Sequence, residues 1–475
     1  MLTYKRKIGN KGADVITFSL FLALTFIGWL MIYVVGAGLE GYTNEGLATF
    51  IFDTNVGKQT VWIIISLATF AGVFLLFDHR VWVLFGYPIY VLTILSLVAV
   101  VLFGSEIKGA TSWFRIAGFT FQPSEIAKFG TCLAMATYLN SWSDRLDDLR
   151  TIGLGLGIWI LPALLILLQP DAGSALVFSS FMLVMYREGM APIFYLLGSF
   201  VALMFILGIL YSPYFLIGAL CGVCLLVFAY NTNKRKLLFV GLAIITLAIA
   251  IWGYVAGYGI WVLPGLLLLV GLASAFSYLN RKARLANILL IGLFIGSVFA
   301  GGSNYLFNNV LKPHQQDRLN VWLQPEKANP RGSRYNVLQS QRAIAAGGLE
   351  GKGFNEGHMT KFDYVPEQNT DFIFSVIGEE HGFIGSTAVI LLFFALLWRI
   401  TVIAERQKTT FNRAYAYGVA GILFVHVLVN VGMTMGLMPV IGIPLPFISK
   451  GGSSLLGFSI MLAVLLKLDK YRDVV

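Results

Sequence analysis

Long apolar runs recur along almost the whole chain and constrain its fold more than any other feature. A helix of about 20 apolar residues is long enough to cross the hydrocarbon of a bilayer. Such runs lie near residues 15–36, 59–78, 81–103, 123–140, 152–168, 173–187, 191–211, 213–230, 237–254, 259–277, 285–302, 372–398, 414–435 and 452–467. The chain is 57% hydrophobic and only 12% charged, unlike a soluble globular domain. We therefore predict an all-α polytopic membrane protein with about 14 transmembrane helices, in one domain spanning residues 1–475.

The formal net charge of +10 is concentrated in short connectors between the predicted spans. Basic residues such as Lys5 precede the first span, and others such as Arg80 and Arg150 recur in alternate connectors. This pattern indicates membrane topology and not nucleic-acid binding, and the positive-inside rule places both termini in the cytoplasm. The basic start is followed by an apolar run too long for a signal peptide, so we predict a retained first helix.

One polar, glycine-rich segment interrupts the apolar runs at residues 303–370, over roughly 70 residues. Its interspersed apolar and aromatic residues argue against simple disorder. The charge pattern places it outside the cell, before the last three helices, and we predict that this extracytoplasmic loop carries the chemistry.

Polar residues also cluster at the ends of several spans. Glu125 and Lys128 lie three apart after Pro123, on one face of a helix, and they predict either an interfacial anchor or a polar pocket that opens to the outer surface. Asp171 lies in a tight turn, where it would cap the next helix or serve a site. Asp371 is a further candidate cap, whereas Glu379 and Glu380 lie within a span and should pair with basic residues.

The segment from Asn430 to Ser454 is dense in proline and glycine, which predicts irregular backbone at membrane depth. Lys450 and the amides of the Gly451–Ser454 turn, at a helix start, would suit an anionic group such as a phosphate, and a structural plug is the alternative. Cys132, Cys221 and Cys224 lie inside spans and are interpreted as small apolar residues. No metal site or cofactor is predicted, and dependence on a divalent cation stays open.

These clusters, in this order, resemble the SEDS family of bacterial cell-wall proteins (RodA, FtsW and SpoVE), and most closely its RodA branch. The motifs that carry the resemblance are GA..W at Gly109–Trp113, QPSE..K at Gln122–Lys128, PD.G.A at Pro170–Ala175, P.G..YN..QS at Pro330–Ser340, VPE..TDFIFSVIGEE at Val365–Glu380 and N.GM..GL.PV.GIPLPF.S.GGSS at Asn430–Ser454. Since the family core has about ten spans, residues 211–302 are interpreted as an insertion of extra helices.

The resemblance implies a glycosyltransferase that polymerises lipid II at the outer face of the bacterial cytoplasmic (inner) membrane, with a class B penicillin-binding protein as its partner. It implies a substrate-binding set of motif residues, namely Trp113, Arg115, Glu125, Lys128, Asp171, Gln339, Ser340, Glu367, Asp371, Lys450, Ser453 and Ser454. Arg115, Lys128 and Lys450 are candidates for stabilising the departing pyrophosphate.

The general base is where this sequence departs from the family pattern. The pattern has Asp-Pro in the outer loop, and the matching dipeptide here is Asn329-Pro330. A neutral amide cannot accept a proton as a carboxylate does. Glu326 and then Asp317 are the nearest carboxylates that could replace it. Three functions therefore stay open: a lipid II polymerase, a flippase for lipid-linked oligosaccharides, and a non-catalytic scaffold that activates a penicillin-binding protein.

Overall fold

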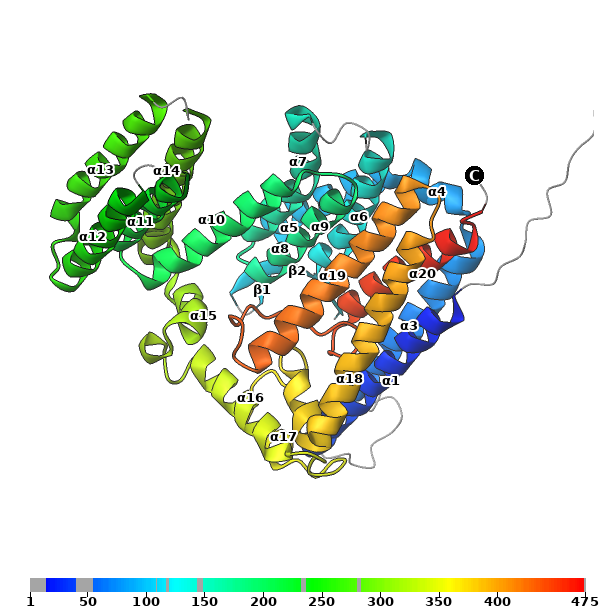
Figure 1. Ribbon diagram of the computed structural model, residues 1–475. Coiled ribbons are helices and arrows are strands. Elements are labelled where there is room, and N and C mark those ends of the chain that lie inside the picture. Colours follow the sequence, from blue (N-terminus) through cyan, green and yellow to red (C-terminus); the bar gives the residue numbers. More distant parts are fainter. Residues whose placement is uncertain are drawn as a thin grey trace, which may run out of the picture. The chain divides into compact units, whose positions relative to one another are not determined.

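The computed structural model describes residues 14–39, 54–107, 109–116, 119–142, 148–231, 236–279 and 283–473, so Lys5 lies outside the described part. Most of the described chain is helical (Figure 1). By its contacts the chain divides into two compact units. One comprises residues Met1–Ala191 and Lys327–Val475, and the other comprises Pro192–Glu326.

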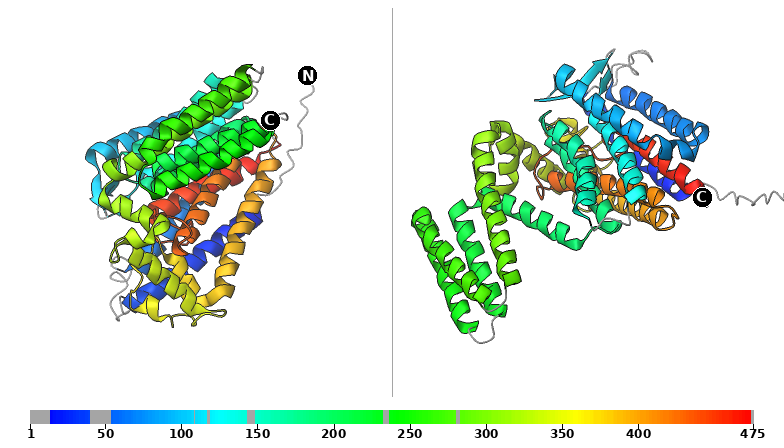
Figure 2. Two further views of the ribbon diagram at one scale, coloured as in Figure 1. Left: turned by 60° about the vertical axis from the view of Figure 1, so that its left-hand side comes forward. Right: turned by 90° about the horizontal axis from the view of Figure 1, so that it is seen from above.

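The first unit is a bundle in which some helices are mostly buried and others are largely exposed. Its elements are α1 (Val15–Leu39), α3 (Asn55–Leu76), α4 (His79–Leu84), α5 (Gly86–Phe103), α6 (Pro123–Trp142), α7 (Leu149–Leu167), α8 (Ala172–Val177), η2 (Phe178–Ser180), α9 (Phe181–Arg187), α16 (Ser333–Gly347), α17 (His358–Lys361), α18 (Ile373–Glu405), α19 (Thr410–Thr434) and α20 (Gly452–Lys470). Most residues of α6, α19 and α20 are buried, so these three helices form the centre of the unit. In both sets of views α19 lies beside α18, and α20 packs against α3 (Figures 1 and 2).

A small antiparallel sheet lies between α5 and α6 and was not predicted from the sequence. It consists of β1 (Ser105–Ile107), β2 (Ala110–Ile116) and β3 (Phe119–Phe121), in the order β1-β2-β3. Ser105 is paired with Trp113, and Arg115 with Thr120. The sheet therefore fixes the backbone of the motif that contains Trp113 and Arg115.

The predicted polytopic helical architecture is confirmed. Within the described residues, eleven helices are long and apolar enough to cross a membrane. The remaining predicted spans correspond to α6 and to two shorter apolar helical stretches, Ala172–Arg187 and Gly259–Ala275. The total of about 14 spans therefore stays a prediction.

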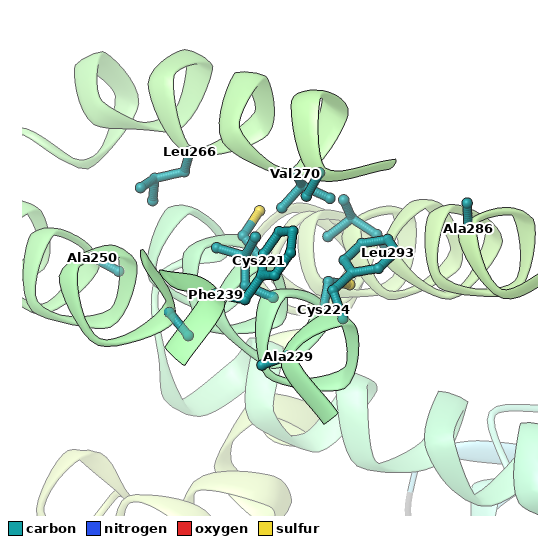
Figure 3. Packing of buried hydrophobic residues seen from close by; sticks show 13 residues of the cluster. Cys221, Cys224, Ala229, Phe239, Ala250, Leu266, Val270, Ala286 and Leu293 are labelled. Carbon is teal, nitrogen blue, oxygen red and sulfur yellow. The ribbon is translucent and has the colours of Figure 1, made fainter. Parts of the chain in front are cut away.

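The second unit contains α10 (Pro192–Leu210), α11 (Pro213–Asn231), α12 (Lys236–Val255), α13 (Gly259–Leu279), α14 (Ala283–Tyr305), the π-helical turn η4 (Leu306–Val310) and α15 (Pro313–Leu323). Its core lies among α11, α12, α13 and α14 and includes Cys221, Cys224 and Phe239 (Figure 3). The two thiols are buried among apolar side chains, as predicted. A Cβ at Gly218 would lie 2.7 Å from that of Ala250, so glycine is what lets α11 approach α12.

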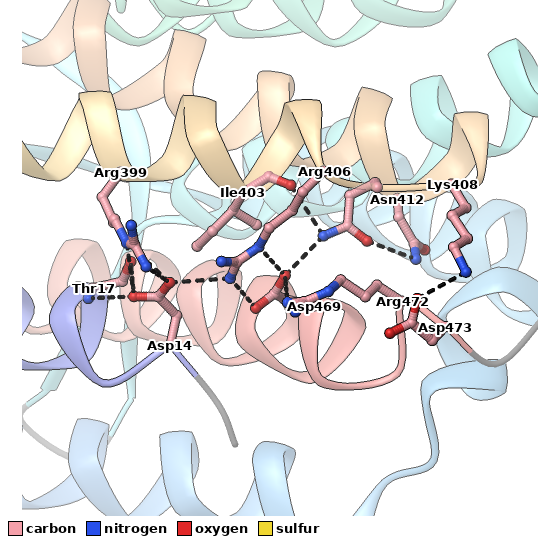
Figure 4. Close-up of polar contacts among 11 residues, drawn as sticks. Asp14, Thr17, Arg399, Ile403, Arg406, Lys408, Asn412, Asp469, Arg472 and Asp473 are labelled. Carbon is pink, nitrogen blue, oxygen red and sulfur yellow. Dashed lines mark hydrogen bonds and ion pairs between the residues drawn. The ribbon is translucent and has the colours of Figure 1, made fainter. Parts of the chain in front are cut away.

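A network of ion pairs joins both chain ends of the first unit to the end of α18 (Figure 4). Asp14, just before α1, binds Arg399 at 2.7 Å and Arg406 at 3.0 Å, and Arg406 also pairs with Asp469 of α20. The carboxylates of Asp14 and Asp469 are 1% and 0% exposed. Buried carboxylates need such partners because their desolvation is costly.

Candidate active site

Glu125 and Lys128 lie in the buried first turns of α6, where Pro123 occupies the first helical position. Lys128 Nζ donates to Glu125 Oε2 at 2.8 Å, and the two side chains are 0% and 3% exposed. Both side chains are therefore enclosed by neighbouring helices, which does not support an interfacial anchor, and the polar pocket that opens to the outer surface stays a prediction. The pair was predicted at a surface because spacing along one helix says nothing of the helices that cover it.

The third member of this cluster is His426 of α19, which the sequence analysis missed. Lys128 Nζ lies 2.9 Å from His426 Nε2, and His426 Nδ1 lies 3.1 Å from the carbonyl oxygen of Pro444. A carbonyl can only accept, so we assign the proton to Nδ1, and Nε2 then accepts from the ammonium of Lys128. The Lys128 ammonium also lies 5.0 Å from the centre of the Phe458 ring. The sequence did offer one clue, because an ionisable residue inside an apolar span is rarely placed without a function.

Asp171 caps α8 and also reaches α6. Its Oδ1 accepts the backbone N–H of Ser174 at 3.0 Å. This is an N-cap bond, so the prediction that Asp171 caps the next helix is confirmed. Its Oδ2 accepts from the Ser174 hydroxyl at 2.8 Å and from Gln122 Nε2 at 2.9 Å. Asp171 and Gln122, 49 residues apart, thus tie the start of α8 to the residue before α6.

Residues 435–451, between α19 and α20, have no helix, and residues 445–449 within them are buried. Asn430 Nδ2 donates to the carbonyl oxygens of Asp371 at 2.9 Å and Ile443 at 2.8 Å. The Ser449 hydroxyl donates to the carbonyl of Thr370 at 2.6 Å and accepts from the backbone N–H of Leu445 at 2.8 Å. Side chains thus form hydrogen bonds with part of the irregular backbone, and any such segment requires these bonds at membrane depth.

Lys450 and the Gly451–Ser454 turn lie at the start of α20, against α3. Lys450 Nζ donates to Asn55 Oδ1, and the backbone N–H of Gly451 donates to Gln59 Oε1 at 3.3 Å. Ser453 and Ser454 are buried. A Cβ at Gly452 would lie 2.0 Å from the ring of Trp62, so the turn is packed tightly on α3. In this structure the Gly451 amide binds a side chain of α3, which supports the structural alternative for this turn.

Trp113 and Arg115 lie on β2, whose pairing with β1 and β3 sets their direction. Successive residues of a strand point to opposite faces, so Trp113 and Arg115, which are two residues apart, share one face of the sheet. Trp113 is partly buried, whereas Arg115 is exposed. Of the three predicted pyrophosphate ligands, Arg115 is thus the one with an exposed charge, while Lys128 is enclosed.

Asn329 forms a turn that an aspartate would form equally well. Its Oδ1 accepts the backbone N–H of Arg331 at 3.0 Å, and its carbonyl accepts the N–H of Gly332 at 3.1 Å. The turn leads into α16. Both Asn329 and Glu326 are exposed, and Glu326 lies in the short turn η5 (Pro325–Lys327). Asp317 lies on α15 and is partly buried.

The remaining predicted residues come from α16 and from the approach to α18. Ser340 is buried and its hydroxyl donates to the carbonyl of Thr434 at 2.9 Å, whereas Gln339 is partly buried. The carbonyl of Glu367, which has φ 61°, accepts the N–H groups of Thr370 and Phe372 at 3.1 and 3.2 Å. Asp371 does not cap α18, because the N-cap residue is Phe372. The Asp371 carboxylate lies next to Gly442, because a Cβ added at Gly442 would be 3.1 Å from Asp371 Oδ2.

Glu379 and Glu380 bind backbone amides and not basic residues, so that prediction is wrong. Glu379 accepts the N–H groups of Met359 at 2.8 Å and Thr360 at 2.9 Å, and the Thr360 hydroxyl at 2.7 Å. Glu380 accepts the N–H of Gly357 at 3.0 Å. A loop that folds back on α18 supplies these donors, and backbone donors leave no pattern in a sequence.

The described residues contain no group of three or more His, Cys, Asp or Glu side chains that could hold a metal ion. The cluster of Lys128, Glu125 and His426 is buried and the capped turn at Asp171 is partly buried, and Glu125, Lys128 and Asp171 come from the motifs on which the resemblance rests.

Comparisons with known proteins agree with the resemblance to the SEDS family. Peptidoglycan glycosyltransferase RodA of Treponema pallidum (strain Nichols) is 32% identical over 461 residues, which cover 94% of this chain and 95% of the relative. Peptidoglycan glycosyltransferase MrdB of Escherichia coli (strain K12) is 30% identical over 381 residues, covering 79% of this chain and 76% of the relative.

Solved structures share the fold. A chain of a peptidoglycan synthase complex that coordinates polymerization and crosslinking matches with a TM-score of 0.60 at 23% identity, covering 97% of this chain and 99% of that chain. The rod shape determining protein RodA of Thermus thermophilus matches with a TM-score of 0.54 at 21% identity, covering 97% and 98%. The FTSW_RODA_SPOVE family model, described as a cell cycle protein, matches residues 14–217 and 193–474, and the chain therefore belongs to the FtsW/RodA/SpoVE (SEDS) family.

Proposed function

We propose that this chain is a peptidoglycan glycosyltransferase that polymerises lipid II into glycan strands at the outer face of the bacterial cytoplasmic membrane. Its family membership carries the proposal, because relatives that cover nearly the whole chain are named for this activity. The multi-pass helical fold suits a substrate held by a lipid anchor. Both termini would lie in the cytoplasm and residues 303–370 outside, with residues 211–302 as an insertion of extra helices.

The reaction needs a base that removes the proton from the acceptor hydroxyl and a cation that stabilises the departing pyrophosphate. We assign the second task to Arg115, because its charge is exposed while that of Lys128 is enclosed by Glu125, His426 and Phe458. Lys128 then acts by holding α6 and α19 together. Lys450 and the residues around Asp171 would position the substrate.

For the base we propose Glu326, with Asp317 as the next candidate. Asn329 keeps the turn into α16 through its amide oxygen, yet it cannot take a proton at the working pH. An aspartate there would accept the same Arg331 N–H and add a carboxylate. Asn329→Asp is therefore a substitution that changes the chemistry while conserving the turn.

A class B penicillin-binding protein is the proposed partner, since one structural neighbour comes from a complex that couples polymerization to crosslinking. The deciding experiment is polymerisation of labelled lipid II by the purified chain with its cognate penicillin-binding protein. We compare the wild type with Glu326→Ala and Asn329→Asp. Glu350→Ala and Asn309→Asp are matched controls, because both positions are also exposed in this part of the chain.

We expect glycan strands from the wild type and from both controls, and a loss of about 100-fold or more in Glu326→Ala, the usual size of a general-base contribution. Glycan strands that appear only after Asn329→Asp would contradict a relocated base and would favour a flippase or a scaffold. That outcome has its own support in the structure, because the aspartate-compatible turn is kept while its charge is lost.

A further inference from the structure

Helix α18 is broken at Gly382, and a loop of the same unit fills the break. Gly382 has φ 60° and ψ −156°, so the helical hydrogen bonds cannot continue through it. Residues 348–364, which we call the seam loop, replace them. The N–H groups of Lys352 and Gly353 donate to the carbonyls of Glu379 and Glu380 at 2.9 and 3.1 Å, and those of Phe383 and Ile384 donate to the carbonyls of Gly348 and Leu349 at 2.9 and 3.1 Å.

The position of this seam along α18 fixes its depth in the membrane. Ile384 lies fifteen residues before Arg399, which is about 23 Å along a helix that rises 1.5 Å per residue. Arg399 pairs with Asp14 at the start of the spanning helix α1 and so lies near one membrane boundary. Since the hydrocarbon is about 30 Å thick, a helix α18 that crosses it would place Leu349 inside this thickness or at the opposite boundary.

Two further contacts hold the seam loop against membrane-spanning helices. Its N–H groups at Gly357, Met359 and Thr360 bind the carboxylates of Glu379 and Glu380, which lie about two turns into α18. Helix α17, which is part of the loop, packs against α1, a second candidate span. The loop thus lies along the sides of two spans and does not project away from them.

The outer surface of the seam loop carries both apolar and ionisable side chains, because Glu350, Lys352, Glu356, His358 and Asp363 are also exposed there. Leu349 is 70% exposed and Phe362 67%, and the neighbouring span residues Phe383 and Ile384 are 65% and 62% exposed. Phe354 and Tyr364 are also exposed. Through the bond of Ile384 to Leu349, the apolar part of this surface continues the exposed apolar surface of α18. A surface that is partly apolar and partly ionisable suits the boundary between acyl chains and headgroups.

We propose that the seam loop lies in the bilayer itself, in the headgroup region and the adjoining acyl chains, and that Leu349, Phe354, Phe362 and Tyr364 contact lipid. Aromatic side chains are favoured at this depth, and the exposed Lys352 can reach lipid phosphates. The loop is then a re-entrant element whose backbone is satisfied by α18. This placement is independent of the proposed enzymatic activity.

Depth-dependent fluorescence quenching tests the proposal on the full chain in phosphatidylcholine and phosphatidylglycerol vesicles. Single cysteines replace Leu349 and Phe362 and are labelled with an environment-sensitive fluorophore. Cys132, Cys221 and Cys224 are buried, so the unmodified chain serves as the labelling control. Ile384→Cys, on the lipid-facing surface of α18, is the positive control, and Lys408→Cys, in the connector after α18, is the aqueous control.

We expect brominated lipids to quench the labels at Leu349→Cys and Phe362→Cys to an extent comparable with Ile384→Cys, and iodide in the buffer to quench only Lys408→Cys. Quenching of the two loop labels by iodide and not by lipid would overturn the proposal. Labels that neither quencher reaches would overturn it as well, since they would be covered by protein. Thermal unfolding of each labelled variant, compared with the unmodified chain, identifies any variant that is misfolded, and Phe354→Cys and Tyr364→Cys then replace it.

Discussion

The charge of Lys128 is buried, and the neighbouring side chains determine how much stability is lost when the charge is removed. Lys128→Met leaves the Glu125 carboxylate buried without its partner, which typically destabilises by about 3–5 kcal/mol. The double substitution Glu125→Gln with Lys128→Met removes both charges, so we expect it to be more stable than Lys128→Met alone. Thermal unfolding of the purified variants in detergent measures the difference.

Lys408→Met is the matched control at the residue scale. Lys408 pairs with Asp473 at 2.8 Å, but the two side chains are 59% and 47% exposed. Exposed pairs contribute below about 1 kcal/mol, so the unfolding temperature should hardly change. If Lys128→Met were as mild as Lys408→Met, the enclosed charge cluster would not stabilise the bundle.

At the scale of elements, the break in α18 depends on one glycine. A Cβ at Gly382 would lie 2.4 Å from the backbone nitrogen of Gly351, and the residue has a φ that other residues adopt only at a cost. We expect Gly382→Ala to cost at least the roughly 1–3 kcal/mol of such strain and to detach the seam loop. Hydrogen exchange at residues 348–361 should then be faster. Gly153→Ala on α7, where a Cβ meets nothing within 4 Å, should leave that exchange unchanged.

The long helices could be predicted from the sequence, because the thickness of the bilayer sets the length of their apolar runs. Each predicted apolar run coincides with helix in the structure, because only a run of about 20 apolar residues can span the hydrocarbon. The strands β1 to β3 were missed because segments of three to seven residues carry little periodicity. His426 was missed as a partner because it lies 298 residues from Lys128. Family resemblance supplied the candidate site, and long-range contacts alone revealed which of its charges are enclosed.

At the scale of the molecule, one ion-pair network holds together segments from both ends of the chain. Asp14 precedes α1, Arg399 and Arg406 end α18, and Asp469 lies near the end of α20. Gln407 adds a bond to Asp469 at 3.0 Å. Because the two carboxylates are enclosed, added salt should weaken this network far less than it weakens the exposed pair of Lys408 and Asp473.

The same network makes stability depend on pH. Burial alone would raise the pKa of Asp14, but hydrogen bonds from Arg399 and Thr17 and the charges of Arg399 and Arg406 lower it below its ordinary value of 3.8. A group with a lowered pKa in the folded state stabilises fully above its unfolded pKa, and this contribution is lost as the pH falls below it. We therefore expect the unfolding temperature of the wild type to fall more steeply than that of Asp14→Asn below about pH 4.

Unfolding curves between about pH 6 and pH 3 test this, with Asp473→Asn as the control. Asp473 binds Lys408 in an exposed pair, so its variant should follow the slope of the wild type. At neutral pH Asp14→Asn should unfold at a lower temperature, because Arg399 and Arg406 lose a buried counter-charge. Parallel curves for the wild type and Asp14→Asn would mean that the carboxylate is no more stabilised in the folded chain than in the unfolded one, and that the chain ends are held by packing of α1 and α20 instead.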